Sequence, residues 1–296
     1  MGGKDPVKHA GKYVPELAAL IHEKNSDPTQ FINLKGILLG NPVTSDVEDL
    51  LGQIDYAWSH AVISDETYRT IRESCDFNSN DTWSNDNCSE AVDQVWTNYD
   101  KIDIYSLYTS ACIKDSTYAE VKTKKTVFKK NRFKTMPHIM GGFDPCLEDY
   151  VTRYYNRPDV QKALHVNDGH QLKNWSLCNM DVLHGWNWEQ SKDSVLPIYK
   201  ILIDLKLRIW VYSGDTDGRV PVLSTTYCLN SLSLPITRAW TPWYYQKQVA
   251  GWLQEFEGLS YATFRGAGHD VPSFKPSESL AFFRSFLRGE SPSIKP

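Results

Sequence analysis

Apolar residues near the start of the chain recur in two patterns, helical spacing and a short continuous run. Residues 12–25 are predicted to form an amphipathic helix whose apolar face is made of Val14, Leu17, Leu20 and Ile21. Residues 33–40 (NLKGILLG) form a continuous apolar run that Gly40-Asn41-Pro42 closes. Such a run is typical of a buried parallel strand that ends in a turn.

The same alternation returns after residue 193. Residues 194–205 are predicted to form a helix, residues 208–212 (RIWVY) a buried strand, and residues 259–264 another strand. A closing helix over residues 277–287 places three apolar side chains on one face, namely Leu280, Phe283 and Leu287. Helices that alternate with short apolar strands predict an α/β fold with a parallel sheet.

The stretch between these two parts has a different character. It carries helix-like pieces, cysteines and a lysine-rich segment over residues 114–134. That segment could bind an anionic partner, although a solvated linker is the simpler interpretation. A helix is predicted to open at residues 156–159 (NRPD), where a polar cap precedes a proline in the first turn. We interpret residues 44–175 as an inserted, mostly helical cap, and residues 1–43 and 176–296 as the core.

Composition limits the class of protein. The chain is 41% hydrophobic and 23% charged, as in ordinary globular proteins. A net charge of −4 and a pI near 6.1 give no reason to expect a nucleic-acid partner. No run of about 18 apolar residues exists, so we expect no membrane span. Residues 1–6 (MGGKDP) contain no apolar stretch that could act as a signal peptide.

Six cysteines and three glycosylation sequons indicate the compartment. No two cysteines form a CxxC pair, so we expect no metal site. The sequons begin at Asn80, Asn87 and Asn174, and the first two stand near cysteines in a polar stretch. Sequons combined with spaced cysteines favour a secretory product.

Two predicted strand ends carry residues suited to acid–base chemistry. Asp215 and Asp217 follow the strand at residues 208–212, and His269 follows the strand at residues 259–264. In open α/β sheets the reactive groups lie at the carboxyl ends of strands. Each residue also has a plainer interpretation. Asp217 could be a turn residue, the two aspartates a weak cation site, and His269 an ordinary loop histidine.

Taken together, the residues have the Asp-then-His chain order of the α/β-hydrolases. Asp217 would orient the imidazole, and His269 would be the general base that accepts a serine proton. Asp217 is preferred to Asp215 because it precedes Val220-Pro221 with the GxxDxxVP spacing of this fold; Asp215 would support the turn. The nucleophile is expected on a G-x-S-x-G elbow ahead of both partners, and these 296 residues contain no such pentapeptide.

A series of motifs runs in order along the chain: AGKYVP (10–15), KGILLGNP (35–42), AWSHAVIS (57–64), NRPDVQKALH (156–165), SGDTDGRVPV (213–222) and GAGHDVP (266–272). These motifs resemble the plant serine carboxypeptidases, whose elbow GESYAG runs directly into (H/K)YVPxLA. AGKYVP matches the second half of that junction. The family's serine then falls on Lys8, so no nucleophile is assigned.

The resemblance implies the C-terminal part of an α/β-hydrolase whose N-terminal third is missing. It implies release of the C-terminal residue from a peptide substrate by acyl transfer to serine, without a cofactor, in a secreted or vacuolar protein. It also implies disulfides that pair Cys75 with Cys88 and Cys112 with Cys146, and it leaves Cys178 without its family partner. The oligomeric state stays open.

Two other functions remain open. Some relatives are acyltransferases, with GDSYSG at the elbow and Thr-Ala-Pro after the histidine. Ala10 and Asp270-Val271-Pro272 favour the hydrolase instead. The third possibility is a catalytically inactive binding protein, which Lys8 at the nucleophile position would fit.

Overall fold

The computed structural model describes residues 9–79, 81–110, 112, 144, 146–166, 174–176, 185 and 193–296. The chain divides into two compact units. Residues 1–108 and 187–296 make the first, and residues 109–186 make the second. Residues 44–108, which were assigned to the predicted cap, lie in the same compact unit as the sheet, and the division into core and cap stays a prediction.

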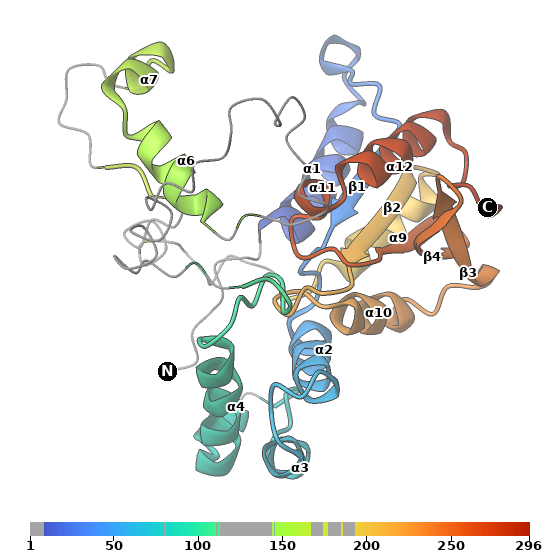
Figure 1. Cartoon of the computed structure of the whole chain (residues 1–296). Helices are drawn as coiled ribbons and strands as arrows, with labels where there is room; N and C mark the ends of the chain where they lie inside the picture. The colour runs from blue at the N-terminus through green and yellow to red at the C-terminus, as the bar shows by residue number, and fades with distance from the viewer. Residues whose placement is uncertain are drawn as a thin grey trace. The chain divides into compact units, whose positions relative to one another are not determined.

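A five-stranded mixed sheet lies at the centre of the first unit (Figure 1). Its strands are β1 (Gly36–Gly40), β2 (Arg208–Gly214), β3 (Ile236–Tyr245), β4 (Gln248–Phe256) and β5 (Leu259–Phe264). The spatial order is β1-β2-β5-β4-β3. The three strands predicted from apolar runs, β1, β2 and β5, are parallel, as expected. Strands β3 and β4 add an antiparallel hairpin that the sequence did not predict.

The missed hairpin has a physical reason. Its turn residues, Gln246 and Lys247, both have positive φ values, of 48° and 63°. Tight hairpin turns of that geometry are usually marked by Asn-Gly or Asp-Gly, so this pair carries no turn signal. In addition, every residue of β3 except Trp243 is exposed or only half-buried, and the strand lacks regular apolar–polar alternation.

Helices cover both faces of the sheet. Helices α1 (His9–Lys24), α9 (Leu196–Asp204) and α10 (Val222–Ser231) pack on one face, where the buried core includes Ala18, Leu39, Leu202, Val211 and Leu229. On the other face, α12 (Pro276–Arg288) places Phe282 against the rings of Trp210 and Phe264, with ring centroids 4.8 and 5.1 Å apart. The short helix α11 (Val271–Phe274) precedes α12.

The outer helices confirm the predicted elements, but their apolar rows lie differently. In α1, Ala18 is 1% exposed, whereas Leu17 and Leu20 are 56% and 48% exposed. In α12, Phe282 and Phe286 are buried, and the predicted row is exposed: Leu280, Phe283 and Leu287. Helical periodicity identifies apolar rows, but it does not say which of two rows meets the sheet.

Helices α2 (Asp46–Ser59), α3 (Asp65–Ser74) and α4 (Asp86–Tyr99) build a second core. Ser64 and Asn85 cap α3 and α4 by accepting hydrogen bonds from backbone amides. The short helix η1 (Pro28–Gln30) follows α1, and η2 (Thr82–Ser84) precedes α4. Helix α2 packs closely against α10, because Gly52 has no side chain that would clash with the Ser224 backbone.

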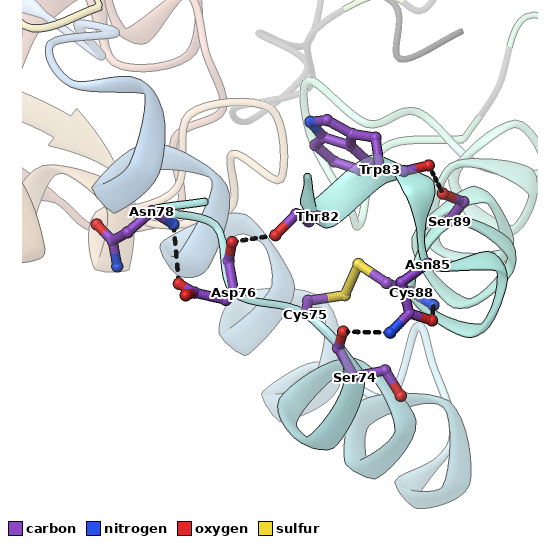
Figure 2. Close-up of a disulfide and its surroundings, with 9 residues drawn as sticks. All are labelled: Ser74, Cys75, Asp76, Asn78, Thr82, Trp83, Asn85, Cys88 and Ser89. Atoms are coloured by element: carbon purple, nitrogen blue, oxygen red, sulfur yellow. Dashed lines mark hydrogen bonds between the residues drawn. A yellow bond between two sulfur atoms is a disulfide. The ribbon is translucent and has the colours of Figure 1, made fainter. Parts of the chain in front are cut away.

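The disulfide between Cys75 and Cys88 joins the end of α3 to the first turn of α4 (Figure 2). Asn85 Nδ2 reinforces this join by donating to the Ser74 carbonyl at 3.0 Å, and Ser89 Oγ donates to the Trp83 carbonyl at 3.0 Å.

The described part of the second unit contains α6 (Leu147–Tyr155) and α7 (Pro158–Ala163). Pro158 opens α7, as the NRPD pattern predicted. A disulfide joins Cys112 and Cys146. The lysine-rich segment lies outside the described residues. None of the described helices is both long and apolar enough to cross a membrane.

Candidate active site

The parallel pairing of β2 with β5 brings the two predicted catalytic residues together. Gly214 at the end of β2 stands in register with Phe264 at the end of β5, so the loops that follow leave the same edge of the sheet. His269 Nδ1 lies 2.7 Å from Asp217 Oδ2. Residues that are 52 positions apart in the chain therefore form one hydrogen-bonded pair.

Asp217 is fully buried and accepts hydrogen bonds on both carboxylate oxygens. Oδ1 accepts from the amides of Arg219 and Val220 at 2.7 and 3.1 Å. Oδ2 accepts from Asn41 Nδ2 at 2.7 Å, in addition to His269. These donors satisfy a buried carboxylate without a cation, and they fix its plane.

The pair defines the tautomer of the imidazole. Since an ionised carboxylate can only accept, the proton of neutral His269 is assigned to Nδ1, and Nε2 is left as an acceptor. The His269 side chain is 26% exposed, so one side of the ring is accessible. An imidazole held in this way can accept a proton from a hydroxyl placed at Nε2.

Asp215 lies in a structural position rather than beside the imidazole. Its Oδ1 accepts from the Gly266 amide at 2.6 Å, and its carbonyl accepts from Tyr56 Oη at 2.7 Å. Burial raises the pKa of its carboxyl group. The first contact joins the loop after β2 to the loop after β5, and the second joins it to α2. Both agree with the predicted role of Asp215 in the turn. Within the described ranges, no group of three or more His, Cys, Asp or Glu residues is arranged to hold a metal ion.

Residues 103–108, here called the bridge segment, connect the loop that carries Asp217 to the loop that carries His269 through main-chain hydrogen bonds. The Ile104 carbonyl accepts from Gly218 N at 2.9 Å, the Tyr105 carbonyl accepts from His269 N at 2.8 Å, and Leu107 N donates to the Thr216 carbonyl at 2.9 Å. Asp103 Oδ1 holds the turn of the segment by accepting from Tyr105 N at 2.9 Å.

The Tyr105 ring also packs edge-on against the His269 ring, with centroids 5.3 Å apart. The bridge segment and Asn41 were not predicted from the sequence as parts of the site. Main-chain hydrogen bonds do not depend on residue type, so the sequence does not reveal them. Asn41 was interpreted only as part of a turn. Its side chain is the one signal that could have identified it, because a buried amide must have partners.

The other predicted residues divide between described and undescribed parts of the chain. Both predicted disulfides are present. Asn87 and Asn174 are exposed, as carbohydrate attachment requires. Lys8, Asn80 and Cys178 lie outside the described residues.

Comparison with known proteins gives one consistent family. The family model described as serine carboxypeptidase matches residues 8–289. Serine carboxypeptidase-like 32 of Arabidopsis thaliana is 59% identical, over 97% of this chain and 61% of the relative. Serine carboxypeptidase-like 31 of the same plant is 60% identical, over 96% of this chain and 59% of the relative. The chain thus spans about three-fifths of the length of these curated relatives.

A solved structure shows the same fold. The crystal structure of a prohormone-processing carboxypeptidase from Saccharomyces cerevisiae superposes with a TM-score of 0.69 at 15% identity. The match covers 95% of this chain and 60% of that one. The α/β fold predicted from the strand pattern is confirmed, and the family model together with the plant relatives shows that the chain belongs to the serine carboxypeptidase family.

Proposed function

We propose that these residues supply the acid–base half of a serine-type carboxypeptidase, which releases the C-terminal residue from peptides. The observation that carries the proposal is the hydrogen bond between His269 Nδ1 and the buried carboxylate of Asp217. The serine has to come from residues beyond these 296, because they contain no nucleophile elbow.

The chemistry follows from the geometry of the pair. The serine hydroxyl gives its proton to His269 Nε2 as its oxygen attacks the scissile carbonyl. Asp217 stabilises the imidazolium that forms and keeps the ring oriented. His269 then returns the proton to the leaving amine, which departs as the released C-terminal residue. Water hydrolyses the acyl-enzyme by the same proton transfers in reverse order.

The cellular setting belongs to the proposal as well. Two disulfides and the exposed sequon residues Asn87 and Asn174 fit an oxidising route, and hence a secreted or vacuolar enzyme with peptides as substrates.

The test is to complete the chain. A segment from a plant relative that ends in Gly-Glu-Ser-Tyr is joined directly to Ala10, and the product is assayed for fluorophosphonate labelling and for release of C-terminal residues at acidic pH. We expect both activities in the completed enzyme. In that enzyme His269→Ala should reduce hydrolysis on the order of a million-fold. His22→Ala, which alters an exposed histidine on α1, is the matched control and should be neutral.

Two outcomes would overturn the proposal. A completed enzyme that folds and remains inert would identify the pair as a relic in a binding protein. A completed enzyme that labels, but transfers acyl groups to alcohols in preference to water, would be an acyltransferase.

A further inference from the structure

Asn41 occupies an unusual backbone position at the end of β1. Its φ is +42°, in the left-handed region that few residues other than Gly, Asn and Asp adopt readily. Its amide donates to the Tyr212 carbonyl of β2 at 2.8 Å, and the residue is 3% exposed. The position therefore tolerates few residue types, and it buries a polar side chain that must be satisfied.

The side chain of Asn41 has only one orientation that satisfies its neighbours. Oδ1 accepts from Gly214 N at 3.3 Å, and Nδ2 donates to Asp217 Oδ2 at 2.7 Å. Gly214 N can only donate and an ionised Asp217 can only accept, so the amide cannot be flipped. Nδ2 also lies 3.5 Å from the Val220 carbonyl, which is a weaker contact.

Asn41 and His269 share the same oxygen of Asp217. Both donors lie 2.7 Å from Oδ2, whereas Oδ1 accepts the amides of its own loop. A second donor on Oδ2 restricts rotation of the carboxylate about the bond to its β-carbon.

We propose that Asn41 is a positioning residue, whose amide holds the Asp217 carboxylate aligned with His269 Nδ1. The role couples the end of β1 to Asp217, which lies 176 residues further along the chain. It rests on the proposed function for its effect on turnover, but not for its effect on the imidazole of His269.

The first experiment uses the 296-residue chain itself and does not require activity. Histidine is labelled with ¹⁵N, and His269→Gln assigns the Nδ1–H proton by NMR. Asn41→Gly keeps the left-handed backbone and removes the donor, so we expect the His269 Nδ1–H resonance to shift and to exchange faster with water. Asn25→Gly is the matched control, because Asn25 also uses both amide atoms to bind a loop, through Ile32, and should leave that resonance unchanged.

The second experiment measures turnover in the completed enzyme. Asn41→Gly should lower kcat by roughly ten- to a hundred-fold, as expected for loss of one hydrogen bond to a charged group, with little change in KM. Asn41→Asp also tolerates the backbone, and its carboxylic acid can donate to Asp217 only while protonated. Its activity should therefore approach that of the wild type at low pH and fall towards that of Asn41→Gly as the pH rises.

The outcomes separate this role from a purely structural one. If the His269 resonance is unchanged in a folded Asn41→Gly chain, or if Asn41→Asp loses activity equally at every pH, Asn41 only closes a turn and the proposal is wrong. If Asn41→Gly does not fold, the dependence of Asn41→Asp activity on pH tests the positioning role by itself. If Asn41→Gly shifts the His269 resonance but the completed enzyme is inert, the positioning role of Asn41 is supported and only the proposed function is contradicted.

Discussion

The thiol of Cys228 lies 3.5 Å from Asp49 Oδ1, in the buried contact between α10 and α2. Asp49 Oδ2 accepts from the amides of Thr44 and Ser45 at 2.7 and 3.0 Å. The neighbouring Asp46 adds a second negative charge, which Lys12 pairs at 2.9 Å. Burial outweighs these donors and raises the pKa of Asp49 from 3.8 to about 7.

This shift predicts that acid stabilises the fold. The folded state holds a proton on Asp49 that the unfolded chain has already lost above pH 3.8. The contribution of this group to the free energy of unfolding is therefore complete below that pH, and it is lost as the pH rises through about 7. We expect urea titrations of the soluble protein to show a drop of a few kcal/mol at most across this window.

Asp49→Asn imitates the protonated carboxyl and should flatten that pH dependence. Asp27→Asn is the control, because the exposed Asp27 has a pKa that hydrogen bonds to Thr29 lower, and the variant should keep the wild-type slope. An Asp49→Asn chain whose stability depends on pH as steeply as that of the wild type would show that another group is responsible.

The absence of a side chain at Gly268 is predicted to allow the bridge segment to pack against the loop that carries His269. A β-carbon there would overlap the Tyr105 carbonyl oxygen and lie 2.8 Å from the Ser106 β-carbon. Gly268→Ala should displace the bridge segment, lower the free energy of unfolding by about 1–3 kcal/mol and speed hydrogen exchange at the His269 amide. Gly185→Ala, where a β-carbon meets nothing within 4 Å, should change neither quantity. Undiminished protection of the His269 amide in Gly268→Ala would contradict the prediction.

The disulfide between Cys75 and Cys88 should stabilise the packing of α3 on α4. Its ends are 13 residues apart, and closing a loop of that size contributes about 3 kcal/mol by restricting the unfolded chain. Cys75→Ser should lower the free energy of unfolding by about that amount in urea titrations without reductant. With excess reductant, wild type and variant should become equal. A variant that matches the oxidised wild type would show that the helices hold together unaided.

The same disulfide should limit glycosylation at Asn87. In the folded chain the middle residue of the sequon, Cys88, is completely buried, and Ser89 Oγ donates to the Trp83 carbonyl (Figure 2). The sequon is thus accessible as a flexible acceptor only before this region folds. In a secretory host, Cys75→Ser should raise the occupancy of Asn87 measured by glycopeptide mass spectrometry, while occupancy of Asn174 serves as the internal reference. Equal occupancy of Asn87 in both chains would show that formation of the disulfide does not limit glycosylation.

Exposed apolar surface on α1 should lower the soluble yield of the isolated chain. Leu17 and Leu20 are both about half exposed, and β1 is the edge strand of the described sheet. Unpaired strand amides beside apolar side chains favour aggregation. Replacing both leucines by lysine should raise the soluble yield, whereas Ala18→Lys, at a position 1% exposed, should prevent folding. A double variant whose soluble yield does not exceed that of the wild type would contradict this expectation.

Much of the fold could be predicted because its signals are local. The apolar runs of β1, β2 and β5 have the length of buried strands, and the two predicted catalytic residues, Asp217 and His269, follow β2 and β5. Parallel strands align their carboxyl ends, so Asp217 and His269 could be placed together before their distance was known. The β3–β4 hairpin could not be predicted, because its exposure pattern and turn residues lack the usual signals.

What the sequence determined by itself was that Asp217 and His269 would lie together, which strands carry them and which cysteines pair. Only the tertiary structure decided which apolar rows of α1 and α12 face the sheet, and which groups hold the catalytic pair in place. The bridge segment acts mainly through backbone amides and carbonyls, which nearly every residue possesses. Asn41 acts across 176 positions of sequence. Neither leaves a local pattern, because hydrogen bonds between distant segments depend on where the folded chain brings the donors and acceptors.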